Sequence, residues 1–141
     1  DWRSGRKIAG LLAEDKCSFR DTVEMMCAST EVVENKFTGN TTIGVVITNG
    51  DFGKASLCKI AGMAQDGYAR AIRPVHTSAD GDSIYAVSAG NVSEKVKADQ
   101  DLVGTLAAEV MSEAIIRAVT SAESAYGFPA YRELKAKENK R

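Results

Sequence analysis

The chain has 141 residues, of which 44% are hydrophobic and 26% are charged, and its formal net charge at pH 7 is −1. This length and balance predict one folded domain with a single core, and they argue against a disordered or membrane-embedded chain. The near-neutral charge gives no electrostatic reason to expect nucleic acid or a membrane surface as a partner. No apolar run approaches the roughly 20 residues that a bilayer-spanning helix needs.

Cysteine and histidine are too few and too scattered for a structural zinc site. The cysteines are Cys17, Cys27 and Cys58, and His76 is the single histidine. Their spacing matches no zinc-binding pattern, so we expect no metal. An odd number of thiols favours a reducing compartment, and we therefore expect a cytoplasmic protein.

The first part of the chain predicts one strand and one helix. Residues 7–13 form a short apolar run suited to a strand. Asp21 is a good N-cap for a helix that extends to Thr30, with Glu24 three residues later as its capping partner. Residues 32–38 have a polar, glycine-bounded composition, which predicts an exposed connector.

The middle of the chain predicts a strand, a helix and a second strand. Residues 43–48 are a mostly apolar run, typical of a strand that is buried on both faces. Apolar residues then recur at helical spacing over residues 57–72, and Pro74 fixes the end of that helix. Residues 83–88 predict a second buried strand, entered through an Asp-Gly-Asp turn. This alternation places the chain in the α/β class.

Two further segments complete the chain. A long amphipathic helix is predicted to start near Asp99 or Asp101 and to extend to Ala118. Basic side chains predominate from Phe128 onward, and little there is available for burial. Residues 128–141 are therefore predicted to be a solvated tail.

Residues 39–49 (GNTTIGVVITN) place a threonine hydroxyl at the mouth of the first middle strand. Threonine is a weak nucleophile unless a base lies beside it, and its own α-amine can serve once the preceding peptide bond has been cut. Gly39 and Asn40 tolerate unusual backbone angles, so the Asn40–Thr41 bond can bend until Thr41 attacks the Asn40 carbonyl. A simpler alternative is a Gly-Asn turn into a strand, with Thr41 favoured by β-propensity alone.

Three blocks of the sequence carry a family likeness: residues 40–46 (NTTIGVV), 64–77 (AQDGYARAIRPVHT) and 80–86 (DGDSIYA). They resemble, in order and spacing, the P1 family of peptidases, the L-aminopeptidase/D-esterase group that includes β-peptidyl aminopeptidases and the endo-type nylon-oligomer hydrolase. The resemblance implies a layered α/β/β/α sandwich, similar to N-terminal nucleophile hydrolases but with different strand connectivity. It also implies a longer precursor, in which residues 1–40 end the larger upstream subunit and residues 41–141 form the smaller, nucleophile-bearing subunit.

Asp80 and Asp82 flank Gly81 at the entrance to the second middle strand. A carboxylate near Thr41 could carry a proton or hold the terminal ammonium in place. In the nylon-oligomer hydrolase the matching pair is assigned to the site, and the resemblance implies the same role here, with Asp82 the stronger candidate because it adjoins the strand. From the residues alone, an Asp-Gly turn with two solvated carboxylates is the alternative.

Arg70, Arg73 and His76 gather around Pro74. They could orient a loop or a substrate carboxylate, but a structural hydrogen-bonding cluster is the interpretation that we adopt. The predicted catalytic set therefore remains Thr41, Asp82 and Asp80.

The resulting prediction is a self-processing N-terminal-threonine amidohydrolase or aminopeptidase, which cuts amide or ester bonds of small peptides or amino-acid derivatives without any cofactor. Its expected partners are the upstream fragment of the same precursor, the substrate and further copies in a homo-oligomer, but neither nucleic acid nor membrane. Two alternatives stay open: a self-cleaving acyltransferase of the ornithine acetyltransferase type, and an inactive fragment that packs against a partner chain.

Overall fold

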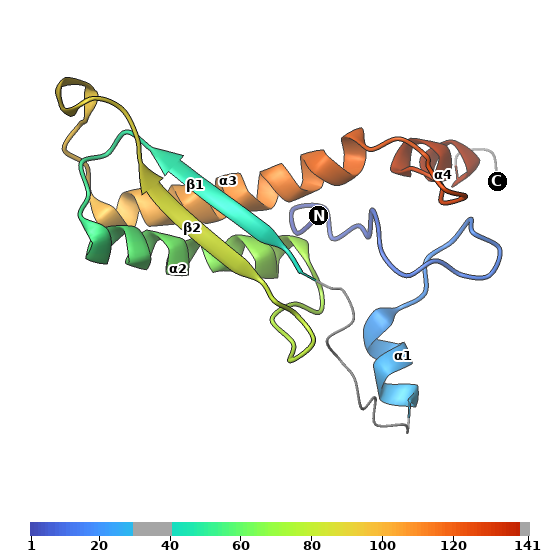
Figure 1. Ribbon diagram of the computed structural model, residues 1–141. Helices are drawn as coiled ribbons and strands as arrows, with labels where there is room; N and C mark the ends of the chain where they lie inside the picture. The colour runs from blue at the N-terminus through green and yellow to red at the C-terminus, as the bar shows by residue number, and fades with distance from the viewer. Residues whose placement is uncertain (30–40, 139–141) are drawn as a thin grey trace. The chain divides into compact units, whose positions relative to one another are not determined.

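The computed structural model describes residues 1–29 and 41–138 (Figure 1). Its contacts divide the chain into two compact units, Asp1–Val33 with Ala114–Arg141, and Glu34–Glu113. The predicted connector at residues 32–38 lies outside the described residues. In chain order the elements are α1 (Thr22–Ala28), β1 (Ile43–Thr48), α2 (Lys54–Ala71), β2 (Ser83–Ser88), the short 3-10 helix η1 (Val92–Glu94), α3 (Gln100–Ser121) and α4 (Tyr131–Glu138).

The second unit is built on a parallel pair of strands. β1 and β2 pair in register, from Ile43 opposite Ser83 to Thr48 opposite Ser88. A parallel pair needs a crossover connection, and α2 supplies it. The bounds of both strands and the α/β class agree with the sequence prediction.

The core lies on one face of the strand pair, where α2 and α3 cover it (Figure 1). Ile60 and Ala64 of α2 and Ala107 of α3 are buried there. Side chains from the strands and from the starts of the helices close the core around these three: Val46, Phe52, Ile84, Ala86 and Val103. Burial of this apolar surface is the main force that holds the helices on the sheet.

Gly67 lets α2 lie directly against α3. A Cβ atom on Gly67 would lie 2.5 Å from the Ala108 carbonyl oxygen and 2.7 Å from Met111 Cβ. Because one of these neighbours is backbone, the close approach requires glycine. α2 ends at Ala71, shortly before Pro74, as the sequence predicts.

The opposite face of the strand pair is open in the described chain, which corrects the prediction of buried strands. Burial alternates along β1, where Ile43, Val45 and Ile47 are 70%, 53% and 72% exposed. Tyr85 and Val87 of β2 are also exposed. An apolar run shows that both faces suit burial, but the described residues supply helices for one face only. The α/β part of the fold is therefore present, and the α/β/β/α sandwich stays an expectation.

Helix α3 begins where the sequence predicts. Asp99 Oδ1 accepts a hydrogen bond from the Leu102 N–H at 2.8 Å, and the Asp99 carbonyl accepts one from the Val103 N–H at 3.1 Å. These bonds satisfy donors that the first turn of a helix leaves unpaired. The helix continues to Ser121, slightly beyond its predicted end.

In the first unit, α1 has the predicted cap. The Asp21 side chain accepts hydrogen bonds from the N–H groups of Val23 and Glu24, and the helix ends at Ala28. An aspartate at this position satisfies two of the orphan donors and also opposes the positive end of the helix dipole.

The segment before α1 does not form the predicted strand. Within residues 7–13, Leu12 makes an isolated antiparallel bridge to Phe19. Asp15 Oδ1 accepts hydrogen bonds from the N–H groups of Cys17 and Ser18, and these bonds turn the chain back within a few residues. The local turn therefore replaces an extended strand.

The basic C-terminal segment contains a helix where a solvated tail is predicted. α4 spans Tyr131–Glu138, and its Leu134 is 8% exposed. Glu133, Leu134 and Lys135 are good helix formers, and Leu134 supplies a side chain to bury. No helix in the described ranges has both the length and the apolar character needed to cross a membrane.

Candidate active site

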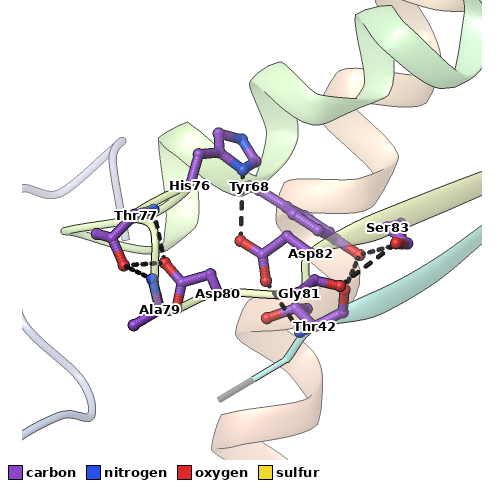
Figure 2. Close-up of polar contacts among 9 residues, drawn as sticks. All are labelled: Thr42, Tyr68, His76, Thr77, Ala79, Asp80, Gly81, Asp82 and Ser83. Carbon is purple, nitrogen blue, oxygen red and sulfur yellow. Dashed lines mark hydrogen bonds and ion pairs between the residues drawn. The ribbon is translucent and has the colours of Figure 1, made fainter. Parts of the chain in front are cut away.

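The predicted site residues meet at the start of the two strands. Thr41 and Thr42 precede β1, and residues 80–82 precede β2. Because the strands are parallel, their first residues lie at the same end of the sheet. The Ser83 N–H donates to the Thr42 carbonyl oxygen at 2.9 Å and extends the strand pairing by one step. Figure 2 shows the polar contacts at this end.

Asp82 is the central acceptor of this cluster. Its Oδ1 accepts a hydrogen bond from the Thr42 N–H at 2.9 Å, and its Oδ2 lies 3.3 Å from His76 Nδ1. The Asp82 side chain is 6% exposed, whereas the His76 side chain is 41% exposed. A carboxylate so far removed from water needs these partners, because an unpaired buried charge is costly. Asp82 therefore holds the backbone directly after Thr41.

Thr41 lies against the Asp-Gly-Asp turn. A Cβ atom on Gly81 would lie 2.8 Å from Thr41 Oγ1, so the hydroxyl occupies space that glycine leaves open. Thr41 is exposed, as a group that must meet a substrate has to be. Asn40 lies outside the described residues, and so does the predicted cleavage bond Asn40–Thr41.

Asp80 contacts its own loop. Its Oδ2 accepts hydrogen bonds from the Thr77 N–H and from Thr77 Oγ1, both at 2.8 Å, and the Asp80 N–H donates to the Thr77 carbonyl at 3.0 Å. Figure 2 shows its carboxylate turned toward Thr77, whereas the carboxylate of Asp82 faces Thr42 and His76. The two predicted carboxylates thus have different partners, and only Asp82 meets the chain beside Thr41.

Tyr68 of α2 reaches the same end of the strands, although the sequence indicates it only as part of an apolar stripe. Its hydroxyl lies 3.3 Å from the Thr42 carbonyl oxygen and 3.2 Å from the Ser83 carbonyl oxygen. Both partners are acceptors, so the phenol must stay protonated to donate. Burial raises the pKa of Tyr68, and the nearby Asp82 carboxylate raises it further. The donor therefore persists across neutral pH.

His76 belongs to this cluster, and sequence reasoning missed its place in it. Its imidazole lies beside Asp82 and stacks on the Tyr68 ring, with centroids 6.1 Å apart and an interplanar angle of 28°. The backbone of His76 has a φ of 56°, in the left-handed region. The sequence indicated His76 as part of a hydrogen-bonding cluster around Pro74, but it did not indicate that the partner would be Asp82.

The arrangement suits the positioning of a nucleophile. An exposed hydroxyl at Thr41 lies next to a backbone segment that a buried carboxylate holds. The Thr42 N–H already donates a hydrogen bond to Asp82, so it is not available to stabilise an oxyanion. Across residues 1–29 and 41–138, no group of three or more His, Cys, Asp or Glu side chains is placed to hold a metal ion.

Comparison with known proteins finds relatives for most of the chain. The model of peptidase family S58 matches residues 4–132. An uncharacterized aminopeptidase of Mycobacterium leprae (strain TN) is 40% identical over 103 residues, which cover 65% of this chain and 28% of that protein. The 6-aminohexanoate-oligomer endohydrolase of Paenarthrobacter ureafaciens is 30% identical over 89 residues, which cover 57% of this chain and 25% of that protein.

A further match extends the same pattern. An uncharacterized aminopeptidase of Mycobacterium tuberculosis (strain ATCC 25618 / H37Rv) is 35% identical over 106 residues, which cover 67% of this chain and 31% of that protein. The chain thus spans less than a third of the length of the curated relatives that it matches. No solved structure matches it.

Proposed function

This chain belongs to peptidase family S58, and on that premise we propose that it is part of a self-processing amidohydrolase whose nucleophile is Thr41. One observation carries the proposal: Thr41 Oγ1 lies against Gly81, next to the Thr42 N–H that Asp82 holds. A hydroxyl at the entrance to a strand, next to a backbone N–H that a carboxylate holds, is placed to react in one geometry.

In the first step, Thr41 Oγ attacks the carbonyl carbon of Asn40. A C–O bond forms, the C–N bond of the peptide breaks, and the hydroxyl proton moves to the departing nitrogen. Water then hydrolyses the resulting ester. Asn40 is left with a terminal carboxyl group, and Thr41 becomes a new amino terminus.

In the second step, the α-amine of Thr41 acts as the general base. An α-amine has an ordinary pKa of about 7.7–8.0, so near neutral pH it can take the hydroxyl proton while Oγ attacks a substrate carbonyl. The leaving amine or alcohol receives that proton, and water hydrolyses the ester formed on Thr41. Because the Thr42 N–H is engaged, we place the oxyanion donors in the upstream portion of the precursor.

The two carboxylates have unequal roles in this proposal. Asp82 fixes the backbone next to Thr41 and so sets where the hydroxyl and the α-amine lie. Asp80 acts more remotely, because it closes the loop through Thr77. We therefore keep both in the proposed site and expect the larger effect from Asp82.

The proposed substrate is an amide or ester bond of a small peptide or amino-acid derivative. The names of the relatives support this class, since two are aminopeptidases and one is an oligomer endohydrolase. The substrate pocket would be shared with the upstream portion of the same precursor, because the relatives are more than three times as long as the segments that match.

Substitution of Thr41 in the full-length precursor tests this function. A Thr41→Ala precursor should stay whole and inactive, whereas Thr41→Ser, which keeps a hydroxyl and an α-amine, should still be cut to a fragment that begins at residue 41. Mass spectrometry of the denatured proteins shows whether each variant is cut. Cleavage of the Ala form at the same bond would rule out self-catalysis. Release of ammonia from an amino-acid amide, without an added acceptor amine, separates a hydrolase from an acyltransferase.

A further inference from the structure

The imidazole of His76 is held from two sides at the candidate site. Its Nδ1 lies 3.3 Å from Asp82 Oδ2, and its ring stacks on Tyr68, which is 1% exposed. Figure 2 shows the ring above the Asp82 carboxylate, on the side away from Thr42. The imidazole is therefore held by one polar and one aromatic contact.

The backbone at His76 supports the same conclusion. Its φ of 56° is uncommon for a residue with a side chain, although histidine, asparagine and aspartate adopt it more readily than most. This conformation costs free energy, and the contacts of the imidazole with Asp82 and Tyr68 offset that cost.

The two oxygens of Asp82 are divided between two partners. Oδ1 accepts from the Thr42 N–H, while Oδ2 faces His76 Nδ1. A carboxylate can rotate about its last bond, because terminal torsions of this kind are broad. When His76 Nδ1 carries a proton, its donation to Oδ2 restricts that rotation and keeps Oδ1 aimed at the Thr42 N–H.

We propose that His76 is a positioning residue: it orients Asp82, and through the Thr42 N–H it fixes Thr41 against Gly81. The kinetic part of this inference rests on the proposed function of Thr41, whereas the structural part does not. His76 does not touch the reacting atoms. It acts through Asp82, so a donor at the position of Nδ1 should be sufficient for its role.

Two substitutions separate the donor from the backbone. Glycine and asparagine both tolerate a positive φ, so neither His76→Gly nor His76→Asn strains the loop. Asparagine keeps an N–H donor near the position of Nδ1, and glycine removes it. Ser88→Ala is the matched control, because it removes a side-chain hydrogen bond to the Gly50 carbonyl at the other end of the same strands.

The first measurement is the rate of self-cleavage of the full-length precursor. His76→Gly should slow cleavage by roughly 10–100-fold, the scale expected when a reacting group is misplaced by about 1 Å. His76→Asn should cleave at a rate closer to wild type than to the Gly variant, and Ser88→Ala should match wild type. A Gly variant with the wild-type rate would overturn the proposal, and so would an Asn variant as slow as the Gly variant.

The second measurement does not depend on cleavage. In a Thr41→Ala precursor, hydrogen exchange of the segment that begins at Thr42 reports whether its N–H stays bound to Asp82. Exchange should become faster with His76→Gly and stay near the parent value with His76→Asn. Unchanged exchange in the Gly variant would overturn the positioning role. If wild-type precursor does not cleave itself but these exchange rates behave as expected, the proposed function fails and the positioning of Asp82 stands.

Discussion

The two ends of the strand pair are held together by different means. At the carboxyl ends, the Ala89 N–H donates to the Thr48 carbonyl at 2.8 Å, the Gly50 N–H to Thr48 Oγ1 at 3.0 Å, and Ser88 Oγ to the Gly50 carbonyl at 2.6 Å. These contacts involve neutral backbone groups and hydroxyls within or directly beyond the strands. They close the loops at that end.

The amino ends are joined by side chains from other parts of the second unit. Tyr68 of α2 and Asp82, from the turn before β2, contact Thr42, and Tyr68 also contacts Ser83. His76, from the loop after α2, contacts Asp82 and Tyr68. This end therefore contains a buried carboxylate, an imidazole and a phenol.

The difference concerns which side chains lie at each end. In open α/β sheets, ligands usually bind beyond the carboxyl ends of the strands. Here the buried carboxylate of Asp82 lies at the amino ends, with Tyr68, His76 and Thr41 beside it. The geometry at this end depends on side-chain contacts, and each contact can be tested by substitution.

The largest effect is expected from Asp82→Asn. If Asp82 positions Thr41, this change should keep the fold but lower turnover by about 10²–10⁴-fold, the range attributed to positioned acid–base groups. Turnover per folded molecule and circular dichroism on the same preparation measure both quantities. Near-normal turnover in Asp82→Asn, and also in the double variant with Asp80→Asn, would remove the pair from the site and erase the contrast between the two ends.

A methyl group on Gly81 tests the placement of the hydroxyl directly. The added Cβ would lie 2.8 Å from Thr41 Oγ1, so Gly81→Ala should displace the hydroxyl and lower turnover by roughly 10²-fold. Gly62→Ala is the control, because a Cβ there meets nothing within 4 Å and should stabilise α2 by about 0.5–1 kcal/mol. Equal turnover in Gly81→Ala and Gly62→Ala would show that a displacement of the Thr41 hydroxyl does not affect turnover.

A weaker effect is expected from Asp80→Asn. Asp80 Oδ2 accepts both hydrogen bonds from Thr77, and the single amide oxygen of asparagine can take its place, but without the negative charge that strengthens these bonds. We expect a loss of about 1 kcal/mol in the free energy of unfolding and a smaller fall in turnover than for Asp82→Asn. Thermal melting and turnover together decide the outcome. A lower melting temperature with unchanged turnover would confine Asp80 to shaping the loop.

The smallest effect is expected from Tyr68→Phe. This change removes the hydroxyl that contacts the carbonyl oxygens of Thr42 and Ser83, and it should lower the free energy of unfolding by about 1 kcal/mol. The pKa of Tyr68 is raised in the folded protein, so the unfolded chain loses its phenol proton first, from a pH of about 10 upward. The stability contribution of Tyr68 is therefore present below that pH and is lost as the pH rises through the folded pKa.

The comparison of unfolding free energies between pH 8 and pH 11 checks this sign. The Tyr68→Phe variant should be less stable than wild type at pH 8, and this difference in unfolding free energy should shrink at pH 11. Tyr126→Phe, at a tyrosine that is 99% exposed, should follow wild type at every pH. A constant difference between wild type and Tyr68→Phe would show that the phenol does not titrate differently in the two states.

Much of the second unit could be predicted from the sequence, because local rules determine it. Capping by Asp99, the proline after α2 and the apolar runs of β1 and β2 each act within a few residues. Whether the outer face of the sheet is covered could not be predicted, because the same apolar run is compatible with a strand covered on one face or on both. α4 was missed because its single buried leucine, Leu134, gives no periodic stripe.

The candidate site was predictable only in part. The family resemblance alone pairs Asp82 with Thr41, and the structure places the Asp82 carboxylate against the N–H of the next residue, Thr42. The places of His76 and Tyr68 could not be predicted, because they depend on one left-handed backbone angle and on how far a helix side chain reaches across the sheet. Neither quantity leaves a periodic trace in a single sequence.

The open outer face of the strands has a practical consequence for handling the protein. Ile43, Val45, Ile47 and Tyr85 form an exposed apolar surface on a two-stranded sheet, and exposed apolar patches of this kind favour aggregation. A preparation of this segment alone should therefore lose solubility as its concentration rises. If the processed fragments were separated with denaturant, recombination would compete with precipitation, and the separation would be irreversible in practice. Production of the whole precursor avoids this competition.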